Sequence, residues 1–513
     1  LHYQLTNPAF KHLSTQWNSF SRIDVTTQMY YQNNNNAENT GRSKALAAIA
    51  IDADADTPIF KWNGSMSDIQ WMKEYMDYMP YEITSNNNNN NTLVIGSGGG
   101  EDVLVALAGG AKNVTAVELN PLIISAAKRF GGSLAGNLYD RKDVHLFIDD
   151  GRRFISSTNS KYDKIVIKLV DSWAAQLAGG YALSENYLYT VEAFKQYMQH
   201  LNGNNGMLVM VRWNIELPRL MPLVVESLKQ QEAKEKTITA ATTTATLAAA
   251  PQAERGAAGS GSAGVGGPQT NSIQDISKQI VVVEDRPGLF FASNNQRNVY
   301  PVLVMVKNSP FTSSELDLIK ARAARNDARV IAIPGLPIQP PYDKLLVSSN
   351  AGLNEPKQQI LSPLSKTIYS QELSSFGMKP PTDDSPFYFA KEKIPAQLVL
   401  LLETVLGVSA VLSFLLVYYS KANKIRLTAS SRLHVIFVIL IGLGFIFLEI
   451  TFIQKFLLLL GTPIMALTVI LFSILLSSGI GAYLSGRLFS KNPYRAVIIS
   501  IPILVGILLA HYT

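Results

Sequence analysis

The sequence predicts an α/β protein in which helices cover both faces of a parallel β-sheet, followed by a bundle of transmembrane helices. Two observations support this prediction. Between residues 92 and 229, short runs rich in β-branched residues alternate with longer helical patterns, which is typical of a parallel sheet. After about Pro395 the sequence is almost continuously apolar, in stretches that reach the roughly 20 residues needed to cross a bilayer.

The composition excludes several classes of function. The chain has no cysteine, which rules out disulfides, thiolate catalysis and cysteine-based metal sites. Its 45 basic and 39 acidic residues leave a net charge of +6, and part of that surplus flanks the apolar segments. We see no basic stripe interleaved with aromatic residues, so we predict a membrane partner and no nucleic acid. We also predict no metal. The first residue is Leu1 and the last apolar stretch runs to Thr513, which favours a fragment of a longer protein.

Changes in composition divide the chain into five regions. Residues 1–90 contain short alternating strands interrupted by asparagine runs, and residues 91–229 form a nucleotide-binding α/β domain. Residues 230–275, rich in Ala, Thr, Gly and Ser, cannot bury enough apolar surface to fold and are predicted to be a disordered insertion. The α/β domain is then completed by residues 276–393, and residues 394–513 form about four transmembrane helices.

The predicted strands and helices of the α/β domain follow from local patterns. Apolar β-branched runs predict strands at 92–96, 114–118, 144–148, 164–168, 207–211, 279–284 and 299–306. Helical patterns lie at 101–108 and 188–198, and the stretch Thr312-Ser313-Ser314-Glu315 has the spacing of a capping box that begins a further helix.

The apolar region contains four predicted spans. The first covers 395–419, the second starts near His434, the third covers roughly 464–486, and the fourth starts at Tyr494. In the third span, small residues recur every fourth position and predict a face for close helix packing: Ser473, Ser477, Gly481 and Ser485. Polar residues within the second span are predicted to form an ion pair near the interface rather than a functional site: Glu449, Gln454 and Lys455.

A glycine-rich loop, G-S-G-G-G-E-D at 96–102, joins the first strand of the sheet to a helix. Such a loop allows a tight turn and a close approach of the backbone to a ligand at the helix N-terminus. The second strand ends on Glu118, where an acid can hold ribose hydroxyls, and the third is followed by Asp149 and Asp150 at the same edge. The predicted ligand-binding residues are therefore Gly96, Ser97, Gly98, Gly100, Glu101, Asp102, Glu118, Asp149 and Asp150.

The fourth strand ends in K-L-V-D, which places Lys168 and Asp171 in the same crevice. These two residues are candidate catalytic groups. Three tyrosines downstream are candidates to line the pocket with them: Tyr181, Tyr187 and Tyr189.

Residues 18–229, from W-N-S-F-S-R-I-D-V through the sheet, resemble the spermidine synthase family of polyamine aminopropyltransferases. The resemblance implies a small N-terminal β-domain and a Rossmann-like, class I methyltransferase fold that uses S-adenosylmethionine or its decarboxylated form. The block at 279–390, with P-P-T-D-D-S-P-F-Y-F at 380–389, and the apolar tail resemble an uncharacterised membrane-bound branch of this family. Members of that branch share V-D-S-W-A-A and Y-A-L-S-E-N-Y-L-Y-T, found here at 170–175 and 181–190.

The two halves of the family's site carry over differently. The cofactor half is retained, with Glu118 for the ribose and Asp150 for the adenine amine. In the acceptor half, the loop aspartate falls on Gly99, and the first aspartate of D-S-S-D, which helps deprotonate the attacking amine, falls on Lys168. Only the second survives, as Asp171. The Y-Q-E motif is replaced by Met72-Lys73-Glu74.

These departures predict difficult amine chemistry. A primary amine has a pKa of about 10, so it arrives protonated and needs carboxylates to hold it and a base to deprotonate it. A lysine in place of an acid reverses the local charge, and like charges at ~4 Å repel by several kcal/mol. We expect this repulsion unless Glu101, Asp102 or Glu185 compensates.

Three functions remain open. The first is membrane-anchored transfer of an aminopropyl group from decarboxylated S-adenosylmethionine to an amine acceptor. The second is methyl transfer from S-adenosylmethionine, which depends mainly on proximity and tolerates a poor base. The third is a non-catalytic transporter or sensor that binds a nucleoside.

The predicted location is a multi-pass membrane protein, with homo-oligomerisation left open. Basic residues flank the spans in two loops that share one side, Lys421, Lys424, Arg426 and Arg432 in the first and Arg487, Lys491 and Arg495 in the other. The positive-inside rule would place that side in the cytoplasm and the soluble domain outside. A cytosolic cofactor argues for the opposite orientation, and we favour a cytoplasmic soluble domain.

Overall fold

The computed structural model of the chain describes residues 11–18, 21–27, 45–52, 55–84, 91–170, 185–231, 233, 276–286, 299–337, 379–389, 396–422, 429–460 and 463–488. It divides into two compact units, Leu1–Leu406 and Gly407–Thr513. Several predictions lie outside the described residues: Asp171, Tyr181, most of the 230–275 insertion, the asparagine run at 33–36 and the fourth span.

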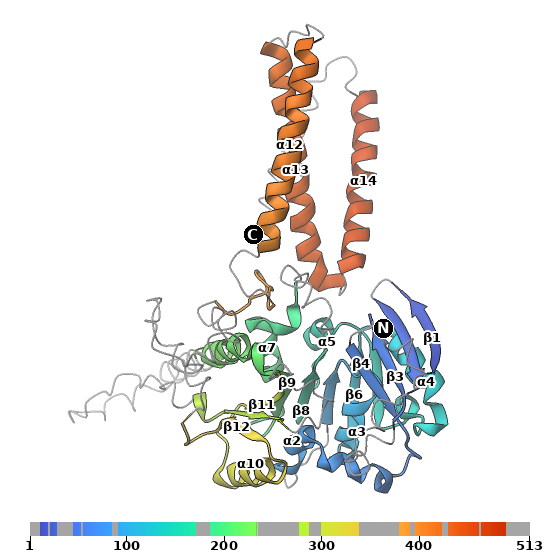
Figure 1. Cartoon of the computed structure of the whole chain (residues 1–513), viewed down its shortest axis with the longest axis vertical. Coiled ribbons are helices and arrows are strands. Elements are labelled where there is room, and N and C mark those ends of the chain that lie inside the picture. Colours follow the sequence, from blue (N-terminus) through green and yellow to red (C-terminus); the bar gives the residue numbers. More distant parts are fainter. Residues whose placement is uncertain are drawn as a thin grey trace, which may run out of the picture. The chain divides into compact units, whose positions relative to one another are not determined.

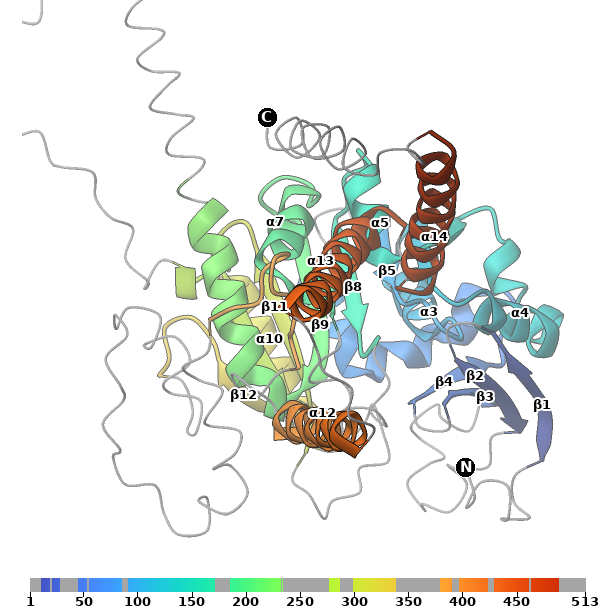
Figure 2. The same ribbon diagram turned by 90° about the horizontal axis from the view of Figure 1, so that it is seen from above.

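The N-terminal strands form a separate antiparallel sheet. Its order is β1 (His12–Trp17), β2 (Arg22–Thr27), β3 (Ala45–Ile51) and β4 (Ala55–Phe60). Figure 2 shows this sheet in dark blue, and β3 packs on α4 (Pro121–Phe130). The β-strand region therefore agrees with the prediction up to Phe60.

Residues 66–82 are helical, although the sequence analysis placed them in the strand region. They form η3 (Met66–Glu74), η4 (Met76–Tyr78) and α2 (Met79–Glu82). Their apolar residues recur at helical spacing and are fully buried: Ile69, Met72, Met76 and Met79. This period of three to four residues favours helical turns over strands.

The main sheet has eight strands in the order β12-β10-β11-β9-β8-β5-β6-β7 (Figure 1). Five are parallel, as predicted: β5 (Asn91–Ile95), β6 (Asn113–Glu118), β7 (Val144–Ile148), β8 (Lys164–Lys168) and β9 (Met207–Trp213).

The remaining three strands pair in antiparallel fashion and lie outside the segment 92–229 for which the sequence predicts a parallel sheet. They are β10 (Ile280–Glu284), β11 (Pro301–Lys307) and β12 (Arg329–Ala332). β11 pairs with β9, and β10 lies between β11 and β12. The result is a Rossmann-like sheet extended at one side by an antiparallel segment.

Helices cover both faces of this sheet. Along the central strands, Val94, Val166 and Val209 belong to one buried cluster and Leu93, Ile165 and Leu208 to another, so both faces are buried. The first cluster includes residues of α3 (Glu101–Ala108), α4 and α10 (Ser313–Arg325), and the second includes α5 (Gly151–Ser157), α7 (Val191–Gln199) and the helix at 217–231. The predicted capping box of Thr312 and Glu315 is present at the start of α10.

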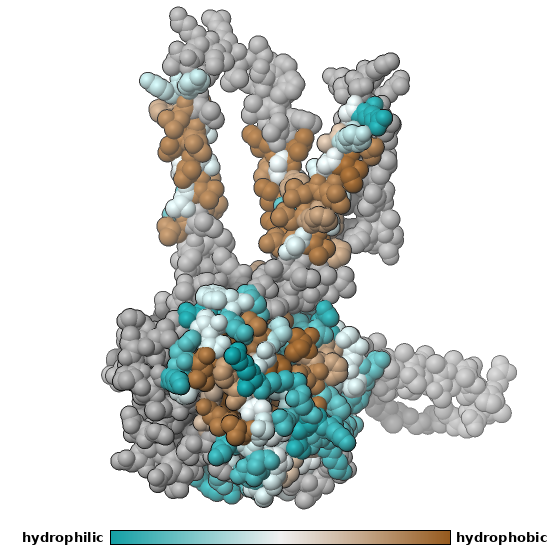
Figure 3. Space-filling view, turned by 90° about the vertical axis from the view of Figure 1, so that its right-hand side faces the viewer, coloured by the Kyte–Doolittle hydropathy of each residue, from teal (hydrophilic) through white to brown (hydrophobic). Residues whose placement is uncertain are grey.

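The apolar tail is helical in its described part. It forms α12 (Ala396–Ala422), α13 (Ala429–Leu460) and α14 (Pro463–Leu488), with hydrophobic surfaces in Figure 3. By length and composition, Leu402–Tyr419 and Leu467–Leu484 could each cross a membrane, and Ile439–Ile453 is a shorter apolar stretch. α13 packs against α14.

The polar and small residues of these helices lie as follows. Glu449 is half-buried on α13, whereas Ser473, Ser477 and Gly481 are exposed on α14, so their role as a packing face stays a prediction.

Candidate active site at the carboxyl ends of the strands

The glycine loop makes a tight turn between β5 and α3. Gly96, Gly98 and Gly100 have φ angles of 76°, 56° and 103°, in the left-handed region that favours glycine. A β-carbon on Gly96 would lie 2.4 Å from Cγ1 of Val170, so a side chain has no room there. The hydroxyl of Tyr139 donates a 2.7 Å hydrogen bond to the carbonyl of Gly98 and holds the loop in place.

Glu118, at the end of β6, holds this loop. Its Oε2 accepts a hydrogen bond from the Gly98 N–H and its Oε1 accepts one from the Asn120 N–H, both at 3.0 Å. Burial raises the pKa of Glu118, and the backbone hydrogen bonds oppose that shift. The residue therefore lies at the predicted edge of the sheet, against the glycine loop, and its contact with a ribose stays a prediction.

Asp149 and Asp150 follow β7 at the same edge. The N–H of Asp149 donates to the carbonyl of Glu118, which places the two strand ends side by side. Asp149 forms a 3.0 Å ion pair with Nε of Arg153. Asp150 caps α5, because its Oδ1 accepts a 2.9 Å hydrogen bond from the Arg153 N–H. Burial raises the pKa of the Asp150 carboxyl.

Lys168, at the end of β8, lies among three carboxylates. Its Nζ is 2.7 Å from Oδ2 of Asp77, 3.3 Å from Oε2 of Glu101 and 3.3 Å from Oδ1 of Asp102. The lysine side chain is 6% exposed, so these contacts are largely desolvated. Burial alone would lower the pKa of Lys168, but Asp102, Asp77 and Glu101 outweigh it and raise that pKa well above its ordinary value.

The positive charge of Lys168 is therefore compensated, an outcome that the sequence left open. One ammonium group faces three carboxylates, which leaves a surplus of negative charge at the end of β8. Glu101 and Asp102 supply the compensation that the sequence allowed, and Asp77 adds a third acid that sequence analysis missed. Within the described residues, no group of histidines and acids is arranged to hold a metal ion.

Two of these carboxyl groups titrate near neutral pH. Burial raises the pKa of Glu101 to about 7 and that of Asp102 to about 6, while Lys168 acts in the opposite direction on both. Asp77 also contributes to the rise, as a neighbouring negative charge. Both carboxyl groups therefore hold a proton more tightly than exposed acids do.

Asp77 comes from the helical stretch that sequence analysis treated as strands. The replaced motif Met72-Lys73-Glu74 does not provide it: Met72 is fully buried, and the backbone carbonyls of Lys73 and Glu74 accept hydrogen bonds from Arg322 and Asn326. The available signal was an acid inside the apolar helical repeat M-D-Y-M, where a charge needs a buried partner.

The backbone of Gly99 is covered by β4. Its N–H donates a 2.8 Å hydrogen bond to Oγ1 of Thr57. A β-carbon on Gly99 would lie 2.2 Å from the carbonyl oxygen of Pro58. The N-terminal sheet thus occupies the space of any side chain at this position, so the missing loop aspartate is not a simple point substitution.

The two predicted tyrosines of η8 (Tyr187–Tyr189) have different surroundings. The Tyr187 hydroxyl donates to Oε2 of Glu185 over 3.1 Å. Tyr189 is fully buried, its hydroxyl accepts a hydrogen bond from Nη1 of Arg212, and its ring stacks on Tyr388 with centroids 4.6 Å apart. Tyr189 is therefore a core residue, and a place for Tyr187 in the pocket stays a prediction.

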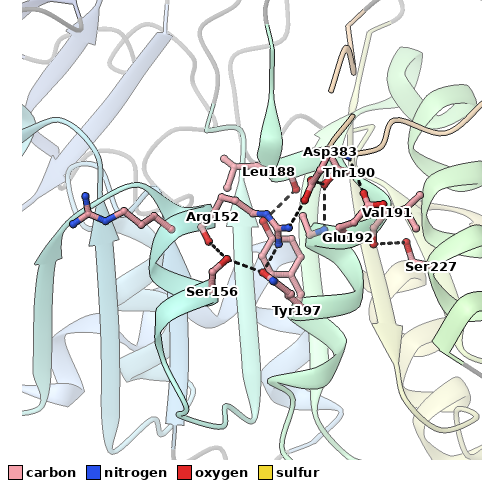
Figure 4. A network of polar contacts seen from close by, with 12 residues as sticks. Arg152, Ser156, Leu188, Thr190, Val191, Glu192, Tyr197, Ser227 and Asp383 are labelled. Atoms are coloured by element: carbon pink, nitrogen blue, oxygen red, sulfur yellow. Dashed lines mark hydrogen bonds and ion pairs between the residues drawn. The ribbon is translucent and has the colours of Figure 1, made fainter. Parts of the chain in front are cut away.

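Residues 379–389, called the strap below, contact α5 and the residues on either side of η8. Figure 4 shows Asp383 of the strap between Arg152 and Thr190, with a 2.8 Å ion pair to Nη2 of Arg152 and a 2.6 Å hydrogen bond from Oγ1 of Thr190. Strap carbonyls of Pro386 and Pro381 accept from the N–H groups of Asn186 and Val191. The strap thus fixes η8 and its flanks.

A second anchor of the strap is Arg219, which donates to three strap carbonyls: those of Lys379, Phe387 and Tyr388. Sequence analysis noted P-P-T-D-D-S-P-F-Y-F only as a point of resemblance. Its structural role depends on contacts that no local pattern reveals.

Comparisons with known proteins agree with the sequence resemblance. Residues 70–253 match the spermine/spermidine synthase domain. A polyamine aminopropyltransferase of Sulfurisphaera tokodaii is 38% identical over 60 residues, which are 12% of this chain and 20% of that protein. Another, from Sulfolobus acidocaldarius, is 27% identical over 96 residues, or 19% and 30% of the two chains. The matched parts thus span less than a third of these curated relatives.

Solved structures with a similar chain path include a probable spermidine synthase from Corynebacterium glutamicum. It has a TM-score of 0.40 and 12% identity, covering 68% of this chain and 99% of that one. The spermidine synthase of Thermotoga maritima has a TM-score of 0.35 and 11% identity, covering 70% and 87%. The part of the chain that resembles this family is therefore the spermine/spermidine synthase domain at residues 70–253.

Proposed function

We propose that the chain is a transferase that moves an aminopropyl group from decarboxylated S-adenosylmethionine to an amine acceptor. The observation that carries this proposal is the surplus of carboxylates around Lys168, next to the glycine loop. A site for two amine-bearing substrates needs negative charge, because primary amines are protonated at neutral pH.

The order of the strands suggests how the donor would lie. Glu118 ends β6 and Asp150 follows β7, so the ribose and adenine would lie over these two strands. β5 separates β6 from β8, and the glycine loop follows β5. The sulfonium and its aminopropyl tail would therefore extend over the glycine loop toward Lys168 and Glu101.

Calorimetry on the detergent-purified chain tests the proposal. We expect binding of decarboxylated S-adenosylmethionine and of methylthioadenosine, weaker binding of S-adenosylmethionine, and turnover when a diamine is added. The carboxylate of S-adenosylmethionine would be repelled by the acidic surplus. Failure of all three compounds to bind would refute enzyme function, and methyl transfer from S-adenosylmethionine would establish the methyltransferase alternative instead.

We further infer that α12, α13 and α14 anchor the enzyme in a bilayer as part of a multi-pass segment. The support is the length and apolar composition of Leu402–Tyr419 and Leu467–Leu484, whose large side chains are mostly exposed. After alkaline extraction the full chain should remain in the membrane pellet, and protease should cut the α/β domain only from the cytoplasmic side. Release of the full chain into the supernatant would refute the anchor.

A further inference from the structure

Glu101 is the member of the Lys168 cluster with the best access to solvent. Its side chain is 15% exposed, compared with 3% for Asp77 and 11% for Asp102. It is also the first residue of α3, directly after the glycine loop. A substrate that lies over this loop would meet Glu101 before the other two acids.

The other acids hold Lys168 from the protein side. Asp77 makes the shortest contact with the ammonium group through Oδ2, and its Oδ1 is buried with no hydrogen-bond partner among the described residues. Asp77 therefore brings a negative charge next to Lys168 and offsets the lysine's attraction for Glu101. Because the lysine is shared among three carboxylates, Glu101 keeps the capacity to bind a second cation or a proton.

The position that should supply a base in this family is held by Lys168, which is charged and cannot accept a proton. Gly99 has no room for a side chain, since Pro58 occupies that space. Among the described carboxylates at the end of β8, Glu101 is the one placed to contact an acceptor amine. The 3.3 Å separation from Lys168 Nζ is compatible with an ion pair that loosens when a substrate cation arrives.

We propose that Glu101 is the catalytic base of the aminopropyl transfer and that Lys168 is its positioning residue, an inference that rests on the proposed function. The acceptor's ammonium gives one proton to the Glu101 carboxylate, which frees the nitrogen lone pair. The lone pair attacks the CH₂ next to the sulfonium, and the C–S bond breaks with its electrons kept on sulfur. Neutral methylthioadenosine and a secondary ammonium product result, and Glu101 returns its proton to water.

The electrostatics of the cluster suit this role. Burial raises the pKa of Glu101 to about 7, and Lys168 limits that rise. A base is most effective when its pKa lies near the working pH. Within the part of the chain that the structure describes, the charged groups that face Glu101 are Lys168 from β8, Asp77 from η4 and Asp102 from α3.

The test compares full-length wild type with three variants: Glu101→Gln, Glu101→Asp and Lys168→Met. The control is Asp317→Asn on α10, where the Asp317 side chain is 76% exposed. For each variant we would measure methylthioadenosine binding and the pH profile of kcat at saturating donor and diamine. Glu101→Gln should lower kcat by about 100-fold or more, the usual contribution of a general base, and leave methylthioadenosine binding within twofold. Glu101→Asp should recover part of the rate.

Lys168→Met should move the acid limb of the kcat profile to higher pH, because removing the lysine raises the pKa of Glu101. If Lys168 had a purely structural role, Lys168→Met would lower the stability of the protein without moving this limb. A Glu101→Gln variant with kcat within threefold of wild type, while wild type is active, overturns the role of Glu101 and leaves the proposed function standing. Wild type that binds methylthioadenosine but transfers nothing to any diamine overturns the proposed function and the inference with it.

Discussion

Arg152 and Asp383 are 231 positions apart in the sequence, yet Nη2 of the arginine lies 2.8 Å from Oδ2 of the aspartate (Figure 4). The arginine side chain is 7% exposed and the aspartate 24%. Arg152 is in the first turn of α5, whose N-cap is the predicted adenine-binding residue Asp150. The strap, a few residues before α12, is thereby joined to the edge of the sheet at which we predict the cofactor to bind.

Replacing Asp383 by Asn should destabilise the α/β domain and weaken nucleoside binding. The change leaves the nearly buried guanidinium of Arg152 without its charge partner, and we expect a loss of about 2–3 kcal/mol, less than for a fully buried pair because Asp383 is partly exposed. Thermal unfolding in detergent and methylthioadenosine titration would measure both effects. The neighbouring Asp384 is exposed, so Asp384→Asn is the matched control. Equal thermal stability and equal methylthioadenosine binding of the two variants would contradict this role of the ion pair.

The strap should also define where the soluble domain ends. A chain that stops after residue 393 keeps the contacts of Asp383, Tyr388 and Arg219, whereas one that stops after residue 378 loses all of them. We expect the longer chain to be monodisperse and to bind methylthioadenosine, and the shorter chain to aggregate, because Tyr189 loses its stacking partner. Equally good folding of both chains would move the domain boundary to before the strap.

The acid cluster predicts a specific dependence of stability on pH. The pKa of Glu101 is raised from 4.5 to about 7 and that of Asp102 from 3.8 to about 6, so the folded state binds these protons more tightly than the unfolded state. The contribution of these two groups to the free energy of unfolding should therefore be largest at low pH and fall as pH rises from about 4 to about 7, by on the order of 6 kcal/mol when the two groups titrate independently.

Chemical denaturation of wild type and Glu101→Gln across this range checks the prediction. Glutamine has no proton to lose, so the variant should show a shallower slope and be at least as stable as wild type at pH 8. Parallel curves for the two proteins would show that Glu101 does not carry the effect.

A side chain at Gly99 should not be tolerated. In Gly99→Ala the new β-carbon would overlap the backbone carbonyl of Pro58, which lies 2.2 Å away, so β4 or the loop must shift. Overpacking of this kind costs about 1–3 kcal/mol, and we expect loss of nucleoside binding as well. Gly407→Ala, where nothing lies within 4 Å of an added β-carbon, is the control. Unchanged binding by Gly99→Ala would show that the loop moves freely against the N-terminal sheet.

The sequence predicts those features that depend on local periodicity. The strands β5 to β9 and the start of α10 follow from β-branched runs and a capping box, and the long helices α12 to α14 follow from long apolar stretches. The pairing direction of β11 against β9 could not be predicted, because the period of a strand is the same in both directions.

The candidate site could be predicted only in part, because some of its contacts join residues that lie far apart in the sequence. Glu118 and Asp150 stand at strand ends that the sequence marks, so their location was accessible. The pairing of Lys168 with Asp77 could not be predicted, because Asp77 is 91 positions away and belongs to a helical element in a region predicted to form strands. Tyr189 was predicted to line the pocket but lies in the core, because its ring stacks on that of Tyr388 in the strap.

The pairing of β9 with β11 has a consequence for synthesis of the chain. At the end of this pair, Asn214 accepts a hydrogen bond from Tyr300, 86 positions later. A ribosome adds about 5–20 residues per second, so the open edge of β9 waits several seconds for its neighbour. During that time a fully apolar strand, M-L-V-M-V, is available to other nascent chains. We therefore expect co-translational chaperone contact to concentrate between the emergence of β9 and that of β11.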